Sequence, residues 1–301
     1  THGHGDHARP GSERYLAPEP GRAILDKRLA TESGPPSIET LRYGERRTIG
    51  EVSLTFYPAG HVLGSAQVRL EHRGEVWVVT GDFKRAPDPT CAPFAPVRCD
   101  TLVTEATFAL PIYRWPDPAA EVRAIVQWWR ANAEAGRASL LYAYSLGKAQ
   151  RILAELTAHT DDAVYTHGAT EALVERYRAE GVAMLPSRPV QPEPKDTDWA
   201  GRLVIAPPSV RRSRWLKRFG DHETAFASGW MLLRATRKRR GLDRGFVLSD
   251  HADWPALLRT VADSEAERVL CTHGRPEVLA RFLREERGLD QQTLRDGLAL
   301  A

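Results

Sequence analysis

The sequence predicts an α/β protein built from two domains. Strand-like segments rich in β-branched and aromatic residues alternate with segments of helical spacing along almost the whole chain. Unusual polar residues follow the strand-like segments repeatedly, and open α/β architectures place their sites at such strand ends. The length of 301 residues exceeds one ordinary domain and is enough for two cores.

The predicted elements follow one another in a regular order. Four segments have the composition of single strands: 51–61, 75–83, 98–107 and 202–209. Residues 119–136 have helical spacing and end at a glycine, as helices often do. Four segments combine a strand, a loop and a helix: 139–156, 162–181, 244–263 and 266–288. Residues 187–199 are rich in proline and polar side chains, so we expect a surface connection there.

Composition excludes several classes of protein. No apolar run approaches the ~20 residues that are needed to span a bilayer, so we expect no membrane partner. The three cysteines are Cys91, Cys99 and Cys271, an odd number without a C-x-x-C pair. That pattern argues against a disulfide scaffold and fits a cytoplasmic protein in a reducing compartment.

Basic residues gather in two short stretches, 211–218 and 234–240, although the net charge is only +3. Such grouping suits the phosphate backbone of a nucleic acid, and a solvated helix face is the alternative for either stretch alone. Aromatic residues beside these stretches could stack on bases, but core packing is the favoured interpretation for each of them: Trp199, Trp215, Phe219 and Trp230. The predicted nucleic-acid contacts are Lys148, Arg211, Arg212, Arg214, Lys217, Arg237, Lys238 and Arg239.

The chain starts with THGHGDH, which has the spacing of a metal-binding loop. Alternate residues of an extended chain point the same way, so His2 and His4 can face one cation. The following turn can direct Asp6 and His7 toward a second cation. Imidazole nitrogens and a carboxylate are the ligands expected for zinc or a similar divalent ion, and a purification tag or a solvated loop is the alternative. Because a strand feeding this loop would lie upstream, we expect the chain to be part of a longer one.

Four later polar residues follow predicted strands in the same way: His61, Asp82, His251 and His273. Each alone has a structural explanation, such as a surface histidine or a turn aspartate. The glycines before Asp82 and after His273 would let the backbone turn tightly beside a bound ion. Together with the first loop, these residues supply the neutral nitrogens and the bridging carboxylate that a two-metal site needs.

The segments THGHGDH, PAGHVLGSAQ and VTGDF, in this order, resemble the metallo-β-lactamase fold. DTLVTEATFALP, AYSLGKAQRIL, LSDHADW and CTHG resemble its nucleic-acid-processing branch, the β-CASP nucleases, and most of all the bacterial ligase-associated DNA exonucleases. The resemblance covers essentially the whole chain. It implies an αββα sandwich whose N-terminal strands are missing from this chain, with an inserted β-CASP α/β domain. The implied metallo-β-lactamase domain comprises residues 1–112 and 243–301, and the insert comprises 113–242.

The resemblance also implies the metal ligands and the catalytic residues. One ion would be held by His2, His4 and His61, and a second by Asp6, His7 and His273, with Asp82 as the bridge. Zinc suits this histidine-rich set, and manganese and iron are alternatives. Besides Asp6 and Asp82, the implied catalytic residues are Glu105 and His251.

Glu105 and His251 resemble the first two β-CASP motifs, in which the carboxylate pairs with the imidazole so that it can protonate the leaving oxygen. A structural acid at a turn is the alternative for Glu105. For His251 the alternative is a helix N-terminal residue, although Ser249 or Asp250 is the better cap candidate.

Two further histidines have similar surroundings. VYTHG around His167 repeats the pattern of VLCTHG around His273. The order of motifs favours His273 as the ligand, because it follows His251 by one predicted helix. GDHE at His222 resembles a metal motif, but no predicted strand precedes it. We expect His167 and His222 to face the surface or a substrate.

The leading functional hypothesis is a two-metal phosphodiesterase that acts on DNA as an exonuclease in DNA repair. An RNase of the 3′-end-processing kind is the alternative among nucleases, since the same residues would serve. A hydrolase of small substrates is less favoured because it would not need the basic domain. A non-catalytic nucleic-acid-binding subunit is disfavoured by the complete ligand set. The resemblance alone implies an association with a DNA ligase and a helicase.

Overall fold

The computed structural model describes residues 1–31, 34–194, 196–235, 242–287 and 290–293. The chain divides into two compact units, one formed by Thr1–Arg114 with His251–Ala301 and the other by Trp115–Asp250. These units divide at 114/115 and 250/251, whereas the predicted domain boundaries fall after residues 112 and 242 and stay a prediction. The second boundary lies later because β13 (Arg244–Phe246) pairs with β12 (His222–Ala227) inside the second unit.

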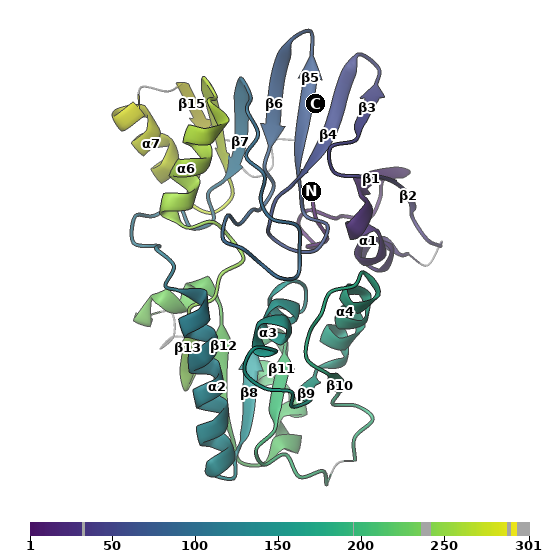
Figure 1. Ribbon diagram of the computed structural model, residues 1–301, viewed down its shortest axis with the longest axis vertical. Coiled ribbons are helices and arrows are strands. Elements are labelled where there is room, and N and C mark those ends of the chain that lie inside the picture. Colours follow the sequence, from purple (N-terminus) through teal and green to yellow (C-terminus); the bar gives the residue numbers. More distant parts are fainter. Residues whose placement is uncertain (32–33, 195, 236–241, 288–289, 294–301) are drawn as a thin grey trace. The chain divides into compact units, whose positions relative to one another are not determined.

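The first unit is built on a seven-stranded mixed sheet, shown in Figure 1, with the order β15-β14-β7-β6-β5-β4-β3. Strands β3 to β6 are antiparallel neighbours, whereas β6, β7, β14 and β15 run parallel. The strands are β3 (Arg46–Ile49), β4 (Val52–Pro58), β5 (Ala66–His72), β6 (Glu75–Val79), β7 (Thr101–Glu105), β14 (Arg268–Thr272) and β15 (Asp290–Thr293).

The core of the first unit forms where the parallel strands meet two helices, α6 (Trp254–Ser264) and α7 (Pro276–Arg287). Apolar side chains from both layers form one buried cluster, which includes Val78, Leu102, Val269, Leu257 and Leu279. Complete burial of such a side chain contributes about 1.5–3 kcal/mol relative to its exposure. This packing fixes β7 and β14, whose ends carry predicted site residues.

A smaller layer follows the N-terminal loop. The helix α1 (Arg22–Leu29) lies between β1 (Arg14–Pro18) and β2 (Ser37–Leu41) in the chain, and the two strands pair in parallel. Leu25 and Leu29 of the helix share a buried cluster with Ala17 and Ile38. None of these three elements was predicted, and neither were β3, β5, β12 and β15.

The second unit contains a six-stranded sheet in the order β10-β9-β11-β8-β12-β13, and its paired strands are all parallel. Its remaining strands are β8 (Ala138–Tyr142), β9 (Val164–Thr166), β10 (Ser187–Pro189) and β11 (Leu203–Ala206). Strand β10 lies inside the segment that was expected to be only a surface connection.

Alternating side chains of this sheet form two separate clusters. One contains Leu141 and Ile205 together with the helices α2 (Pro118–Glu134), α3 (Lys148–Leu156) and α4 (Gly168–Ala179). The other contains Leu140 with Trp199 and Phe219, so those two aromatic residues pack in the core. Two 3-10 helices, η2 (Pro208–Arg212) and η3 (Arg214–Phe219), carry the first basic stretch.

The α/β class and every predicted strand and helix are confirmed. The αββα sandwich itself stays a prediction. Within the described part of the chain, no helix is both long and apolar enough to cross a membrane.

Candidate metal centre and acid pair

The predicted site residues meet at one edge of the seven-stranded sheet. Strands β4, β6, β7 and β14 all run in the same direction, so their carboxyl ends lie at this edge. The chain places one polar residue at or just after each of these ends: His61, Asp82, Glu105 and His273. The N-terminal loop brings three further histidines to the same place: His2, His4 and His7.

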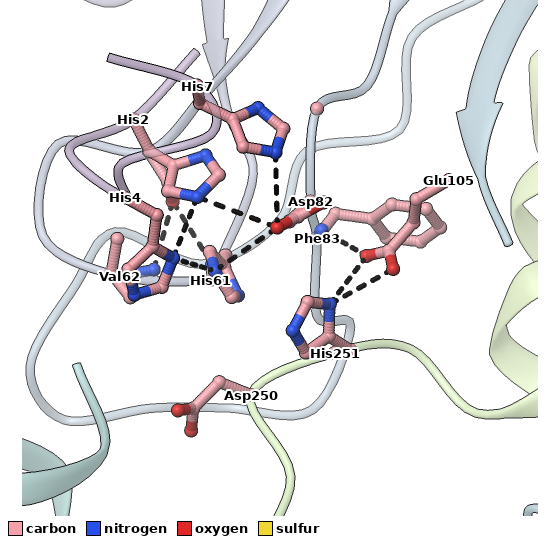
Figure 2. Close-up of polar contacts among 12 residues, drawn as sticks. His2, His4, His7, His61, Val62, Asp82, Phe83, Glu105, Asp250 and His251 are labelled. Carbon is pink, nitrogen blue, oxygen red and sulfur yellow. Dashed lines mark hydrogen bonds and ion pairs between the residues drawn. The ribbon is translucent and has the colours of Figure 1, made fainter. Parts of the chain in front are cut away.

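Three histidines and Asp82 form a first group of possible ligands (Figure 2). His4 Nδ1 lies 2.8 Å from His2 Nε2 and 3.2 Å from His61 Nε2. Asp82 Oδ2 lies 3.5 Å from His2 Nε2 and 3.8 Å from His61 Nε2. Zinc–nitrogen bonds of 2.0–2.1 Å in a tetrahedron separate the ligand atoms by about 3.3 Å. The four side chains therefore fit a divalent ion.

A second group shares Asp82 and adds His7 and His273. His7 Nε2 lies 3.4 Å from Asp82 Oδ2, and the rings of His7 and His273 are 5.2 Å apart. His7 Nε2 and Asp82 Oδ1 are buried without a hydrogen-bond partner among the described residues. Buried polar atoms without partners are costly, and a bound cation would supply the missing interaction.

Asp6 lies at the margin of this second group. Its side chain is 64% exposed, and its carboxylate lies 3.9 Å from His7 Nε2. The role of Asp6 as a ligand stays a prediction.

The electrostatics of the site suit metal ligation, which requires neutral imidazoles and ionised carboxylates. Burial lowers the pKa of His2 well below its ordinary value, and the neighbouring His61, His4 and His7 lower it further. Burial by itself would raise the pKa of Asp82. The adjacent imidazoles of His7, His251, His61 and His2 outweigh burial and hold the pKa of Asp82 below its ordinary value.

Close backbone turns direct the ligands toward this edge. Gly81, before Asp82, and Gly274, after His273, have positive φ angles of 57° and 59°, as predicted. A Cβ atom on Gly274 would lie 2.3 Å from the Ala106 carbonyl oxygen and 2.4 Å from Thr107 Cα. Only glycine therefore lets the loop after β14 approach the loop after β7 this closely.

Gly274→Ala is expected to destabilise the first unit, by on the order of 2–4 kcal/mol, because left-handed strain and a backbone clash act together. The matched control is Gly44→Ala, at a φ of 80° where a Cβ would meet nothing within 4 Å. This control carries the conformational strain alone, about 1 kcal/mol. Urea unfolding in the presence of EDTA measures both variants without the contribution of metal. Equal decreases in the free energy of unfolding of the two variants would show that the backbone clash at Gly274 does not contribute to the destabilisation.

A carboxylate–imidazole pair lies beside Asp82 (Figure 2). Glu105 is buried, and its Oε2 lies 3.0 Å from Nδ1 of His251. The backbone N–H of Phe83 donates to Glu105 Oε1 at 2.7 Å, and the Phe83 carbonyl accepts from Ala252 N–H at 2.7 Å. Glu105 therefore fixes the histidine and the segment that carries Asp82 at the same time. Nothing in the sequence indicated the contribution of the Phe83 backbone.

The predicted nucleic-acid contacts fall into three kinds of position. Those in η2 and η3 are half-buried or exposed: Arg211, Arg212, Arg214 and Lys217. Lys148 is instead buried, and its ammonium lies 2.7 Å from Asp250 Oδ1. Three others lie outside the described residues: Arg237, Lys238 and Arg239.

Lys148→Met tests which role this lysine has. If its ion pair with Asp250 is structural, the free energy of unfolding falls by on the order of 3 kcal/mol, because a buried charge loses a partner. Nucleic-acid binding by the folded protein is then unchanged. The matched variant is the exposed Lys217→Met, expected to weaken binding while stability changes by less than about 0.5 kcal/mol. Thermal unfolding and oligonucleotide binding measure both, and a stable Lys148→Met protein that binds poorly would contradict the structural role.

The two ambiguous histidines lie in the second unit. His167 caps α4, and its Nδ1 accepts from the N–H of Ala169 at 3.2 Å. His222 is the first residue of β12, and its Nδ1 lies 2.8 Å from the Gly220 carbonyl oxygen. Neither residue belongs to a possible metal-binding group within the described ranges.

Known proteins resemble this chain to different extents. No family model matches it. The chain is 33% identical over 297 residues to a probable DNA ligase of Opitutus terrae, over 96% of this chain and 28% of that protein. It is 33% identical over 122 residues to the endoribonuclease ysh1 of Emericella nidulans, over 39% of this chain and 14% of that protein. A crystal structure of a protein of unknown function from Enterococcus faecalis V583 shares the fold, with a TM-score of 0.64 and 14% identity over 97% of this chain and 77% of that one.

Two groups of possible metal ligands at the strand ends, a buried carboxylate–imidazole pair and these relatives point to a class of nucleases. The chain belongs to the β-CASP nucleases of the metallo-β-lactamase fold. It spans 28% of the length of the first relative and 14% of the second.

Proposed function

We propose that this chain is the nuclease part of a metal-dependent DNA exonuclease that hydrolyses phosphodiester bonds with two divalent ions. The observation that carries the proposal is the convergence of five histidines on Asp82, beside the Glu105–His251 pair. Both an ion-binding group and a proton donor are thereby available at one edge of one sheet, as phosphodiester hydrolysis requires.

Each side chain has a stated task in this proposal. His2, His4 and His61 would hold one ion and His7 and His273 the other, with Asp82 available as a ligand to both. Two divalent ions, when bound, activate a water molecule and neutralise the charge that develops on the phosphate. The histidine-rich ligand set favours zinc, with manganese or iron as alternatives.

His251 holds the proton that the leaving oxygen takes up. Glu105 accepts a hydrogen bond from Nδ1 of this imidazole, and this contact orients the ring and stabilises its protonated form. The ring of His251 lies 4.7 Å from that of His61, so the proton donor is adjacent to the first ligand group.

DNA is the proposed substrate because similarity to the relative named as a probable DNA ligase extends over 96% of the chain. The proposed phosphate contacts are the accessible basic residues of η2 and η3: Arg211, Arg212, Arg214 and Lys217. A role in DNA repair and an association with a ligase and a helicase are part of this proposal.

The decisive experiment offers matched single-stranded DNA and RNA, each labelled at the 5′ end or at the 3′ end, with added zinc or manganese. Early release of a mononucleotide from one end of the DNA, absent when Asp82→Ala protein is used, is the expected result. Release of label from neither DNA end would overturn the proposal.

An endoribonuclease is the second candidate, favoured by the 33% identity to the endoribonuclease of Emericella nidulans. It predicts internal cuts in the RNA and intact DNA in the same experiment.

A further inference from the structure

A pocket of about 270 Å³ lies in the second unit, at the carboxyl ends of three adjacent parallel strands. Tyr142 ends β8, Pro208 follows β11 and Phe226 lies near the end of β12, and all three residues line the pocket. From β8 the chain builds β9, β10 and β11 on one side and then β12 and β13 on the other. Open parallel sheets bind ligands at such a change of direction, outside the carboxyl ends of the strands.

The charge of the pocket suits an anion. Arg211 and Arg212, two neighbouring residues of η2, both line it. Guanidinium groups bind phosphate with paired, charge-assisted hydrogen bonds. No acidic residue is among the described residues that line the pocket. The carboxylate of nearby Asp243 accepts instead from the backbone N–H and the hydroxyl of Thr224, at 2.9 and 2.7 Å.

The Tyr142 side chain adds a hydrogen-bond donor without a partner. Tyr142 is buried, and within the described ranges its hydroxyl has no hydrogen-bond partner. Burial raises the pKa of Tyr142 to about 12, so the phenol keeps its proton at neutral pH. A buried hydroxyl without a partner costs about 1–3 kcal/mol, which a ligand oxygen reaching it would offset.

An exposed aromatic ring packs against Phe226, one of the residues that line the pocket. Tyr144 follows β8 by two residues and is 42% exposed, which is unusual for a large apolar side chain in this chain. Its ring packs edge-on against Phe226, with 5.9 Å between the centroids and 68° between the planes. Exposed aromatic faces beside cations stack on the unpaired bases of nucleic acids.

We propose that these residues form a nucleotide pocket, which binds one nucleotide of a single-stranded nucleic acid. The phosphate contacts Arg211 and Arg212, and the base stacks on Tyr144. The pocket volume of about 270 Å³ is slightly below the usual range for ligand pockets. The pocket therefore accommodates a phosphate and sugar, and the base lies outside it on the exposed ring of Tyr144. The proposal rests on the proposed nuclease function, because it takes the ligand to be the substrate of that activity.

Binding of a fluorescein-labelled oligothymidylate, followed by anisotropy, tests the pocket. The full chain carries Asp82→Ala, and EDTA is present, so that binding is measured without hydrolysis. Tyr144→Ala is expected to raise Kd about 5- to 150-fold, the equivalent of one stacked base, whereas Tyr144→Phe keeps the ring and binds as the parent does. Arg211→Ala with Arg212→Ala is expected to raise Kd at least tenfold and to reduce the salt dependence of binding.

The matched control removes two other arginines of the second unit, Arg137 and Arg188. Arg137 precedes β8 at the opposite, amino-terminal end of that strand, and Arg188 is an exposed residue of β10. If this control loses as much affinity as the variant without Arg211 and Arg212, the loss of affinity is explained by net charge alone and the pocket proposal is wrong. Unchanged affinity of Tyr144→Ala would overturn it too. Thermal melts verify that each variant is folded.

The nuclease function and the pocket can fail separately. If the protein with intact Asp82 cleaves DNA but the pocket variants bind normally, only the pocket proposal is wrong. If the protein with intact Asp82 cleaves no nucleic acid but the pocket variants selectively lose binding, the pocket is supported and the proposed nuclease function is wrong.

Discussion

The Asp82→Ala protein is expected to retain at most one metal ion per chain and to cleave no DNA above background. Among the described residues, Asp82 is shared by the two groups of possible metal ligands, and its Oδ2 lies 3.4 Å from His7 Nε2 and 3.5 Å from His2 Nε2. Without its negative charge, several imidazoles are left to hold two dications, which favours loss of at least one ion. Metal content by mass spectrometry and cleavage of end-labelled DNA give the two readouts.

Asp26→Ala is the matched control, because Asp26 is a half-buried residue of α1 whose side chain is 43% exposed and forms a surface ion pair with Arg22. It should keep the full metal content and the full rate. If the Asp82→Ala protein still holds two ions and cleaves at an unchanged rate, Asp82 is not a ligand that the activity requires.

His251→Ala is expected to slow cleavage of DNA about 10²- to 10⁴-fold while metal content is unchanged, because a general acid contributes a factor of that size. The defect should nearly vanish on a p-nitrophenyl ester of thymidine 5′-phosphate. Its leaving group departs as a stable phenolate and needs no proton. Comparison of the two substrates therefore separates proton donation from metal binding.

Glu105→Gln extends this test, since it keeps the shape of the side chain but removes the charge that faces His251. We expect the same selectivity between the two substrates, with a smaller loss on DNA. The control is His222→Ala, which removes a histidine outside the possible metal-binding groups. Equal losses of His251→Ala on both substrates would argue that the imidazole serves the metal centre and not the leaving group.

The placement of the ligand residues could be predicted because each follows a strand with a clear composition. His61, Asp82 and His273 needed only the rule that the ends of strands running in one direction share an edge. The partner of His251 could be predicted only through the family resemblance. The N–H of Phe83 that holds Glu105 could not be predicted, because every residue except proline has such a group.

The burial of individual polar side chains was the property that could be predicted least from the sequence. Lys148 was predicted to contact nucleic acid, which stays a prediction, and the sequence did not indicate that it is buried and pairs with Asp250, about a hundred residues away in the chain. Asp6 lies in a ligand-rich run and is exposed nonetheless. Strand β12 was missed because its first residues, His222 and Glu223, are polar, and only pairing with β8 makes them part of a sheet. Long-range pairing decides the cases of Lys148 and β12.

The discontinuity of the first unit has a consequence for biosynthesis. Strand β7 lies between β6 and β14, and Thr101 pairs with Trp77 on one side and Arg268 on the other. As the chain leaves the ribosome, β7 emerges long before β14 and shows one unpaired edge, although all of its side chains are buried in the finished protein. The second unit is continuous, so its sheet can close during this interval. We expect the nascent first unit to be the species most prone to aggregation, and its folding to finish only after β14 has left the ribosome.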